Sequence, residues 1–290
     1  DSRDKSDRDV DLVGVVLARM DKCRTMWADE CSTQCYVEYS HSLNNSLHLA
    51  SNNLSSKDCL RLARELRHNT KIYNLDVSSN FIADQGASAL SSVLLVNSSL
   101  EYLNAGSNGI SAEGVDCMST ALRANDALKF LELSFNGFGD AGATCLADML
   151  TVNQSLEHLG LGFNGILEPG AIALSRSLHD NTRLRTLELS YNAIGDQGLK
   201  ELAKSLLHCP TLKTLGLVSN GITDEGCEYL AEVLEENGGL EVVGLSSNLI
   251  GDAGAARLAA ALYKNDRLKS LYLEENEIGE EGGRALEKAA

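Results

Sequence analysis

A row of acidic residues is the first feature of this sequence that could do chemistry, because regularly spaced carboxylates can bind cations or transfer protons. The row consists of Asp84, Asp140, Glu168, Asp196, Asp224, Asp252 and Glu280. Each residue stands two positions before a glycine and opens a stretch with helical spacing. A carboxylate at a helix start accepts N–H bonds and lies at the positive end of the helix dipole. We therefore interpret the row as structural, with weak cation association as the alternative.

Glycines recur in the same register and could be taken for a loop that holds phosphate with its backbone N–H groups. They are Gly86, Gly114, Gly142, Gly170, Gly198, Gly226, Gly254 and Gly282. No GxxxxGK[ST] string accompanies them. Their regular recurrence favours close packing between neighbouring helix starts.

Histidines and cysteines form no pattern typical of catalysis. The six histidines are spread thinly, and the chain contains no HExxH, no GxSxG and no Cys/His pair with metal-ligand spacing. Cys23, Cys31 and Cys35 cluster near the N-terminus, but their spacing does not fit a C-x₂-C zinc site. Structural residues are the preferred interpretation, and a disulfide or a metal site are alternatives. We expect no enzyme active site, no metal and no cofactor.

Composition narrows the function further. The 290 residues carry a formal charge of −16, which disfavours binding to nucleic acids and to anionic membranes. No apolar run approaches the ~20 residues that cross a bilayer, so we expect no membrane insertion. The scattered cysteines indicate reduced, cytoplasmic usage. The sequence does not begin with Met, so an organellar protein that has lost a targeting segment is the alternative.

An asparagine that recurs every 28 residues shows which elements position these side chains. It is found at Asn52, Asn80, Asn108, Asn136, Asn164, Asn192, Asn220, Asn248 and Asn276. The residues before it alternate between Leu and polar types, as Leu131 and Leu133 illustrate, which predicts a strand with one buried face. We expect the Asn amide to bond to backbone groups of its own and the next coil.

The second half of each repeat has helical spacing, with leucines four residues apart and a small residue between them, as in Leu202, Ala203 and Leu206. An Asn then closes the helix at Asn69, Asn97, Asn125, Asn153, Asn181, Asn237 and Asn265, and Cys209 replaces it once. Because Asn tolerates the left-handed conformation, we expect it to end the helices in that way. One repeat cannot bury its apolar face alone, so nine copies must stack.

The pattern LxxLxLxxNxI followed by xDxGxxxLAxxL resembles the ribonuclease-inhibitor type of leucine-rich repeat, over residues 44–290. The resemblance implies a right-handed αβ solenoid, a horseshoe of nine 28-residue repeats, with parallel strands on the concave side and helices on the convex side. Repeats of this class occur in ribonuclease inhibitors, in the sensing half of NOD-like receptors and in Ran GTPase-activating proteins. The class does not identify a partner.

The segment before the repeats has a pattern of its own. Val10, Val13, Leu17 and Met20 share one face of a predicted helix, and Trp27 follows. Because a solenoid end exposes core leucines, we expect residues 1–43 to form a helical cap, with an amphipathic helix that docks on a partner as the alternative.

Strand residues that do not enter the core must face the concave side, where the repeats differ most. Aromatic and acidic residues gather there at Tyr102, Phe130, Glu132, Phe135, His158, Phe163, Glu188 and Tyr191. We predict that these eight residues contact a protein partner of basic or mixed charge. In the alternative, Phe135, Phe163 and Tyr191 only pack on one another as a stabilising rim. Basic residues nearby argue against a uniformly negative wall: Lys129, Arg185, Lys213 and Lys269.

The first functional hypothesis is a non-enzymatic protein-protein interaction scaffold, either a receptor-type sensing domain or a subunit of a larger assembly. The alternative is a GTPase-activating protein of the Ran-directed kind, which rests on the resemblance alone. Such proteins have less uniform repeats and an acidic tail, and no position here matches a catalytic residue. Inhibition of a secreted nuclease ranks last, because ribonuclease inhibitors are richer in cysteine and alternate two repeat lengths.

Overall fold

Strands and helices alternate through the part of the chain that the computed structural model describes, residues 45–236 and 238–289. The strands are β1 (Ser46–His48), β2 (Asn74–Asp76), β3 (Tyr102–Asn104), β4 (Phe130–Glu132), β5 (His158–Gly160), β6 (Thr186–Glu188), β7 (Thr214–Gly216), β8 (Val242–Gly244) and β9 (Ser270–Tyr272). The helices are α2 (Ser56–Leu66), α3 (Ala83–Leu94), α4 (Ala112–Leu122), α5 (Gly139–Leu150), α6 (Glu168–Asp180), α7 (Gly195–Leu206), α8 (Asp224–Glu236), α9 (Asp252–Leu262) and α10 (Glu280–Ala289). The predicted cap, residues 1–43 with Cys23, Cys31 and Cys35, lies outside the described residues.

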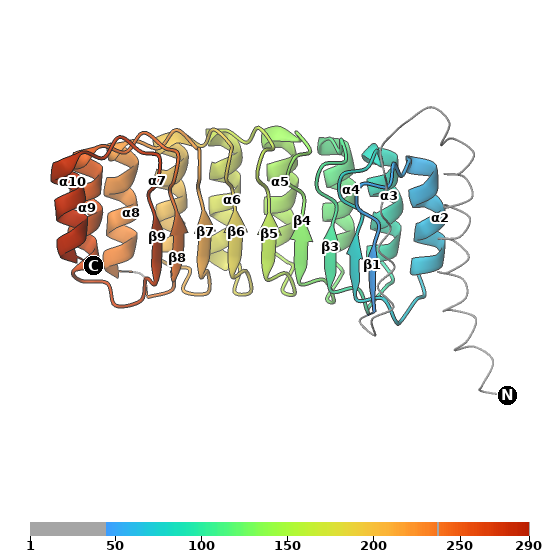
Figure 1. Cartoon of the computed structure of the whole chain (residues 1–290). Helices are drawn as coiled ribbons and strands as arrows, with labels where there is room; N and C mark the ends of the chain where they lie inside the picture. Colours follow the sequence, from blue (N-terminus) through green and yellow to red (C-terminus); the bar gives the residue numbers. More distant parts are fainter. Residues whose placement is uncertain (1–44, 237, 290) are drawn as a thin grey trace, which may run out of the picture.

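The strands form one parallel sheet whose spatial order is the order of the sequence, β1 to β9 (Figure 1). Partners in neighbouring strands are 28 residues apart, as in Leu103 opposite Leu131 and Leu131 opposite Leu159. A 28-residue sequence period therefore becomes a stack without any register shift. Each turn of the stack is called a coil here, and coil 4, for example, consists of β4, the turn that follows it and α5.

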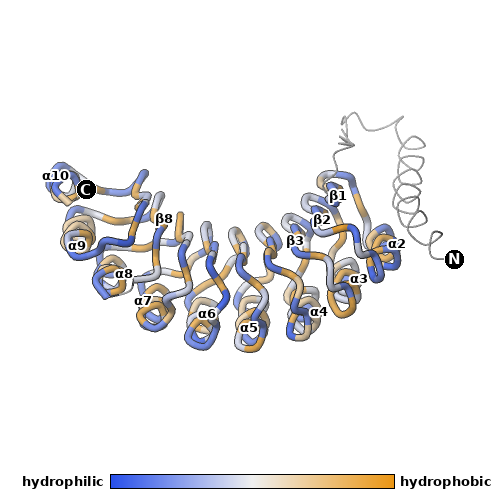
Figure 2. Tube along the Cα trace, turned by 90° about the horizontal axis from the view of Figure 1, so that it is seen from below, coloured by the Kyte–Doolittle hydropathy of each residue, from blue (hydrophilic) through white to orange (hydrophobic). Residues whose placement is uncertain are grey.

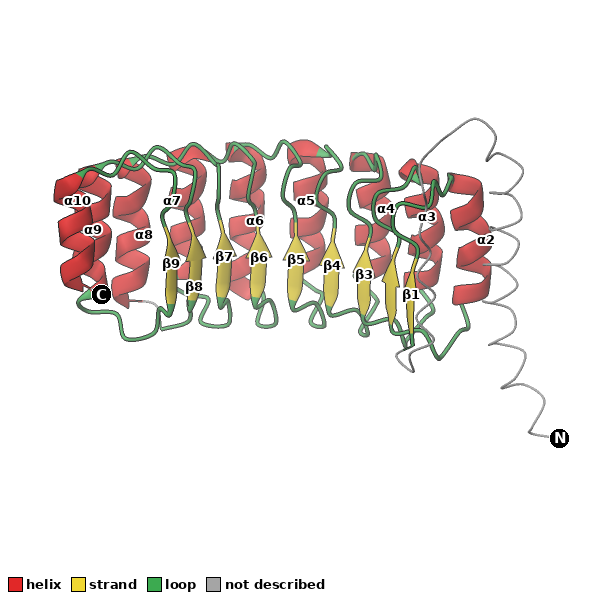
Figure 3. Cartoon of the chain, in the orientation of Figure 1, coloured by secondary structure: helices red, strands yellow, loops and turns green. Residues whose placement is uncertain are grey.

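The stack has two layers and is curved. The strands lie side by side in one layer and the helices in the other (Figure 3). Seen along the strands, the coils form an open arc with the helices on the outer side (Figure 2). A helix is wider than a strand, so a stack of such coils bends toward its strands. The predicted horseshoe with a concave sheet and convex helices is thus confirmed.

The core fills the space between the two layers. In coil 4, Leu131 and Leu133 from the strand region and Leu146 and Leu150 from α5 have no exposed surface. Burial of one such side chain stabilises the fold by about 1.5–3 kcal/mol. The equivalent leucines of the other coils extend this core along the solenoid, so the leucine pattern accounts for the fold.

The repeated asparagine forms a buried ladder behind the strand ends. Asn164 donates its amide N–H groups to the carbonyls of Leu133 and Gly162, at 3.1 and 3.2 Å. Its Oδ1 accepts the N–H groups of Asn136 and Gly137, at 2.9 and 2.8 Å. The ladder was predicted, but its direction was wrong, because each Asn binds backbone groups of its own and the preceding coil rather than the next one.

The asparagines that follow the helices form a second ladder. Asn97 donates to the carbonyls of Leu66 and Asn69 in the preceding coil, at 2.7 and 2.9 Å, and its Oδ1 accepts the N–H groups of Ser99 and Leu100. The left-handed conformation expected for these residues was wrong, since none of the six that the structure describes has a positive φ. Their amides satisfy the last carbonyls of the preceding helix instead.

The five aspartates of the acidic row cap helices, but each one caps the helix of the following coil and not its own. Asp84 Oδ1 accepts the N–H groups of Ser111 and Gly114, at 2.7 and 3.1 Å. Asp140, Asp196, Asp224 and Asp252 do the same one coil further on. The glycines leave room for this contact, because a Cβ at Gly114 would come within 2.5 Å of the Asp84 carboxylate. The close packing predicted for the glycines is therefore confirmed.

The turns that precede the helices are of two kinds. Which kind forms depends on whether the preceding coil supplies an aspartate. In coils 2, 4 and 6, Ala83, Gly139 and Gly195 have a positive φ and donate their N–H to the carbonyl of the next ladder asparagine. In coils 3, 5, 7, 8 and 9 the equivalent N–H donates to an aspartate, at 2.7–2.9 Å. The second kind occurs wherever the preceding coil supplies an aspartate. Coil 5 has Glu168 at that position instead. Glu168 is exposed, and α7 in the next coil starts without a side-chain cap.

Candidate functional site

Three aromatic rings stack at the start of the strands on the concave face. The ring centroids of Tyr102 and Phe130 are 4.2 Å apart, and those of Phe130 and His158 are 3.8 Å apart, with the ring planes within 13° of parallel. Parallel strands place these residues directly opposite one another, which makes stacking geometrically natural. We call these three residues the strand-start stack.

A second stack lies where the strands end. Phe135, Phe163 and Tyr191 follow one another with centroid distances of 4.1 and 4.0 Å, yet 56, 40 and 45% of their surface remains exposed. All three have a positive φ, which is unfavourable for a bulky side chain. Five other coils carry serine at this position, at Ser51, Ser79, Ser107, Ser219 and Ser247. This strand-end stack therefore places exposed aromatic surface where the fold alone does not require it.

Carboxylates occupy the last strand residue of coils 2, 4 and 6, in the register between the two stack positions. We call Asp76, Glu132 and Glu188 the carboxylate row. Each is held by the serine two residues along the chain: the Ser78 hydroxyl donates to Asp76 Oδ1 at 2.7 Å, the Ser134 N–H to Glu132 Oε1 at 2.7 Å, and the Ser190 hydroxyl to Glu188 Oε2 at 3.3 Å. Gly160 and Gly216 give space to two of them, because a Cβ there would collide with the carboxylates of Glu132 and Glu188.

The two glutamates differ in how well their charge is compensated. Burial raises the pKa of Glu132, but His158, whose Nε2 lies 4.0 Å from Oε2, and Ser134 outweigh burial and leave that pKa below its usual value. Burial also raises the pKa of Glu188, and there Ser190 and His158 do not outweigh it, partly because Glu132 adds repulsion. Glu188 is thus a half-buried carboxylate with weak compensation.

Replacement of Glu188 by glutamine is expected to stabilise the protein, although Glu188 is a candidate binding residue. Its folded-state pKa is raised, so its contribution to stability is present at low pH and is lost as the pH rises through that pKa. At pH 7 the Glu188→Gln variant should melt about 1–2 °C above the wild type, and the gain should shrink as the pH falls through that raised pKa. Thermal unfolding followed by circular dichroism measures both temperatures.

The matched control is Glu132→Gln. The pKa of Glu132 is lowered, so its charge stabilises the fold above its unfolded-state pKa and this variant should melt below the wild type at pH 7. A fall in melting temperature for Glu188→Gln at neutral pH would contradict the proposed difference between the two sites.

A row of acidic and basic residues forms one edge of the concave face, directly before the strands. Its basic members, predicted to make the wall less negative, are paired within the row. Lys129 lies 2.9 Å from Glu101, Arg185 lies 3.3 Å from Glu157, and both Lys213 and Lys269 contact Glu241, at 3.7 and 2.6 Å. These ion pairs compensate most of the basic charge, although Lys213 and Lys269 share one glutamate, and the carboxylate row dominates the middle of the face in coils 2 to 6.

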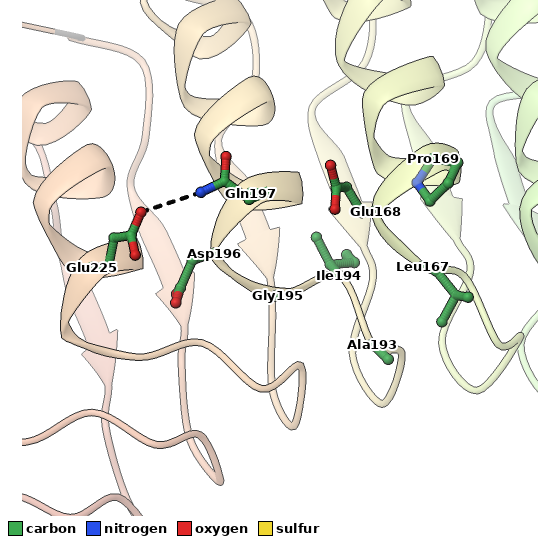
Figure 4. A pocket seen from close by; sticks show the side chains of 9 residues that line it. All are labelled: Leu167, Glu168, Pro169, Ala193, Ile194, Gly195, Asp196, Gln197 and Glu225. Atoms are coloured by element: carbon green, nitrogen blue, oxygen red, sulfur yellow. Dashed lines mark hydrogen bonds between the residues drawn. The ribbon is translucent and has the colours of Figure 1, made fainter.

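A shallow depression of about 540 Å³ lies on the loop side of the solenoid, between the starts of α6, α7 and α8 (Figure 4). Three acidic side chains surround it, but two are already engaged. Asp196 accepts the N–H groups of Thr223 and Gly226, and Glu225 accepts a hydrogen bond from Gln197 at 3.2 Å. With only Glu168 left without such a contact, the depression offers no set of converging ligands.

One motif typical of dinucleotide binding was not expected from the sequence, and its absence had been assumed wrongly. Gly160, Gly162 and Gly165 form a GxGxxG string that starts at the end of β5. In dinucleotide-binding proteins such a string opens a helix and leaves its N–H groups to the phosphates. Here Gly165 has a φ of +68° and lies in a turn ahead of α6, the Gly162 N–H donates to Ser134, and the Glu132 carboxylate covers Gly160. An anionic phosphate would be repelled from this position.

Residues 45–236 and 238–289 contain no group of three or more His, Cys, Asp or Glu side chains that could hold a metal ion. Two of the buried thiols, Cys59 and Cys227, are also unsuited to nucleophilic chemistry. Burial, with a smaller effect of nearby aspartates, raises the pKa of Cys59 and of Cys227 to about 12, so both stay protonated at neutral pH.

The structure brings the eight predicted residues together on coils 3 to 6. Six of them form the two stacks, and Glu132 and Glu188 lie between the stacks. Phe135, Phe163 and Tyr191 do pack on one another, as the alternative predicted, and they also stay exposed. Asp76, the third member of the carboxylate row, was not predicted from the sequence. The repeated acid-x-Ser string, in which Ser78, Ser134 and Ser190 follow the three acids, was the available signal.

The comparison with family models agrees with the repeat architecture. A family model described as "Leucine Rich repeat" matches seven segments, residues 68–91, 96–119, 125–147, 152–175, 180–203, 208–231 and 264–286. No curated protein matches the chain. A solved structure titled "Leiomodin-1 Actin-Binding Site 2 (ABS2)" is similar at 23% identity and a TM-score of 0.42, over 46% of this chain and 80% of that one.

No helix in the described part of the chain is both long and apolar enough to cross a bilayer. The matched segments of the family model together cover more than half of the sequence, and they follow the 28-residue stack seen in the structure. The chain belongs to the leucine-rich repeat family.

Proposed function

We propose that this protein is a non-enzymatic interaction scaffold that binds a protein partner on its concave face, through the two aromatic stacks and the carboxylate row. In this proposal the repeats are of the ribonuclease-inhibitor type. The chain acts as a receptor-type sensing domain or as a subunit of a larger cytoplasmic assembly. The partner carries basic or mixed charge where it meets the solenoid.

The strand-end stack is the observation that carries this proposal. Aromatic side chains dominate the energetics of protein interfaces, and here they are exposed on a rigid sheet rather than buried in the core. The positive φ of Phe135, Phe163 and Tyr191 makes them costly at positions where serine serves the fold in other coils. A binding role explains why this cost persists.

A photoreactive phenylalanine analogue at position 163 tests the proposal in cells that contain the protein. Irradiation is expected to yield a discrete crosslinked protein. The control places the same analogue at Glu228, an exposed residue of α8 on the convex side. Crosslinks from position 228 but not from position 163 would show that the concave face is not the binding surface.

A second variant separates binding from folding. The triple substitution Phe135→Ser, Phe163→Ser and Tyr191→Ser installs the residue that other coils use at this position, so the melting temperature should not fall. Affinity for the crosslinked partner should fall about 30-fold or more, as for central interface aromatics. Isothermal titration calorimetry with the purified partner measures the loss, and unchanged affinity would argue against the stack as a binding element.

A further inference from the structure

The spacing of the carboxylate row contains information about the shape of the partner. Asp76, Glu132 and Glu188 occupy the same position on alternate strands, β2, β4 and β6. Neighbouring strands are about 4.8 Å apart, so successive carboxylates repeat at about 9.6 Å along the solenoid. Asn104 and Gly160 hold the intervening positions and carry no charge. A ligand that neutralises the row must therefore present positive charges at this interval.

The middle of the row lies in a lane that the two stacks border on both sides in coils 4 and 5. Phe130 and Phe135 stand on either side of Glu132, and five residues of extended chain separate them by at most about 16 Å. Of the strand side chains on the concave face of coils 2 to 6 in the described structure, His158 is the only basic one. The lane is thus narrow, acidic and aromatic, and it runs across the strands.

Regular chain conformations differ in how often they present a side chain to the same side. A polyproline II segment does so every three residues, which is about 9.3 Å. An extended β-strand does so every two residues, at about 6.8 Å, and an α-helix returns to the same side after seven residues, at about 10.5 Å. On a concave surface the side-chain tips are closer together than the strands themselves, so the interval at the tips is below 9.6 Å. That curvature favours the polyproline II repeat over the helical one.

We infer that the lane binds a basic segment of the partner in polyproline II conformation, with arginine or lysine at every third position facing Asp76, Glu132 and Glu188. Aromatic walls are the usual surface on which such segments dock, and each cation can lie over a ring while it meets a carboxylate. The weakly compensated charge of Glu188 makes it the carboxylate that gains most from a cation. This inference rests on the proposed function and specifies the partner's chemistry.

Three fluorescently labelled peptides with capped ends and three arginines each test the inference by fluorescence anisotropy with the full chain. The first has the sequence RPPRPPR, the second rearranges the same residues as RPRPRPP, and the third places the arginines seven residues apart in an alanine-rich helix. We expect the first peptide to bind about tenfold more tightly than the other two. The double variant Glu132→Gln and Glu188→Gln should weaken it about tenfold.

The matched control is the double variant Glu228→Gln and Glu232→Gln, which changes net charge equally on exposed positions of α8 and should leave binding unchanged. Equal affinity for the first two peptides would show attraction without register and overturn the inference, as would tighter binding of the helical peptide. If no peptide binds while position 163 still crosslinks to a protein, the inference fails and the proposed function stands.

Discussion

Replacement of Asn164 by alanine is expected to lower the free energy of unfolding by about 2–4 kcal/mol, because the N–H groups of Asn136 and Gly137 lose their acceptor and two buried carbonyls each lose one of two donors. The side chain is 1% exposed and binds two carbonyls and two N–H groups in coils 4 and 5. Urea unfolding followed by circular dichroism should show a large fall in the transition midpoint.

Position in the stack provides the control for this prediction. Asn276 in the last described coil is only half-buried and its Oδ1 accepts one N–H group, from Ile250. Asn276→Ala should therefore cost less than half as much as Asn164→Ala. Asn164→Asp keeps the acceptor oxygen but cannot donate when ionised, so it should fall between the wild type and the alanine variant. Equal losses at Asn164 and Asn276 would show that the ladder is not the source of the effect.

The sequence predicts the architecture well because the repeat supplies the same information many times. Leucines that alternate before Asn136 and leucines four apart in α5 assign strand and helix, and an unbroken 28-residue period leaves parallel stacking as the arrangement that buries both. Any single repeat would be ambiguous, since its short apolar runs fit several elements. Periodicity removes that ambiguity by requiring each position to fit in every coil.

The same periodicity hides the direction of contacts between coils. A residue that recurs every 28 positions could contact the coil before or after it, and the sequence looks identical in both cases. This is why Asn164 was expected to bind the next coil and Asp84 its own helix, whereas both bind one specific neighbour. The handedness with which strand and helix stack decides whether a residue contacts the coil before it or the coil after it. That handedness is a property of three-dimensional packing.

The candidate site could be predicted from the sequence only in part. Alternation along the strand places Phe130 and Glu132 on the concave face, so the sequence can identify the surface. It cannot show that Phe135 adopts a positive φ and stays half-exposed while stacking on Phe163. Nor can it show that Glu132 is compensated by His158 while Glu188 is not, because that difference depends on which way each carboxylate leans.

Substitution of Asp224 by alanine is expected to cost about 2–3 kcal/mol, although Asp224 belongs to α8 and the damage occurs at α9. Its Oδ1 accepts the N–H groups of Gly251 and Gly254, at 2.7 and 2.9 Å. Gly251 is the N-cap of α9 and has no side chain that could replace these bonds. Hydrogen exchange measured by mass spectrometry should locate the increase in exchange at the start of α9 rather than in α8.

Glu168→Ala is the matched control, because Glu168 holds the same repeat position in coil 5 but does not cap the next helix. The turn before α7 instead has Gly195 at a positive φ, and its N–H donates to the carbonyl of Asn220 at 3.0 Å. This substitution should cost less than about 0.5 kcal/mol, as for an exposed residue without partners. If the two acids were interchangeable helix-start charges, the losses would be similar and the faster exchange would lie in each residue's own helix. A large loss at Asp224 alone, felt in α9, requires instead that the carboxylate joins two coils.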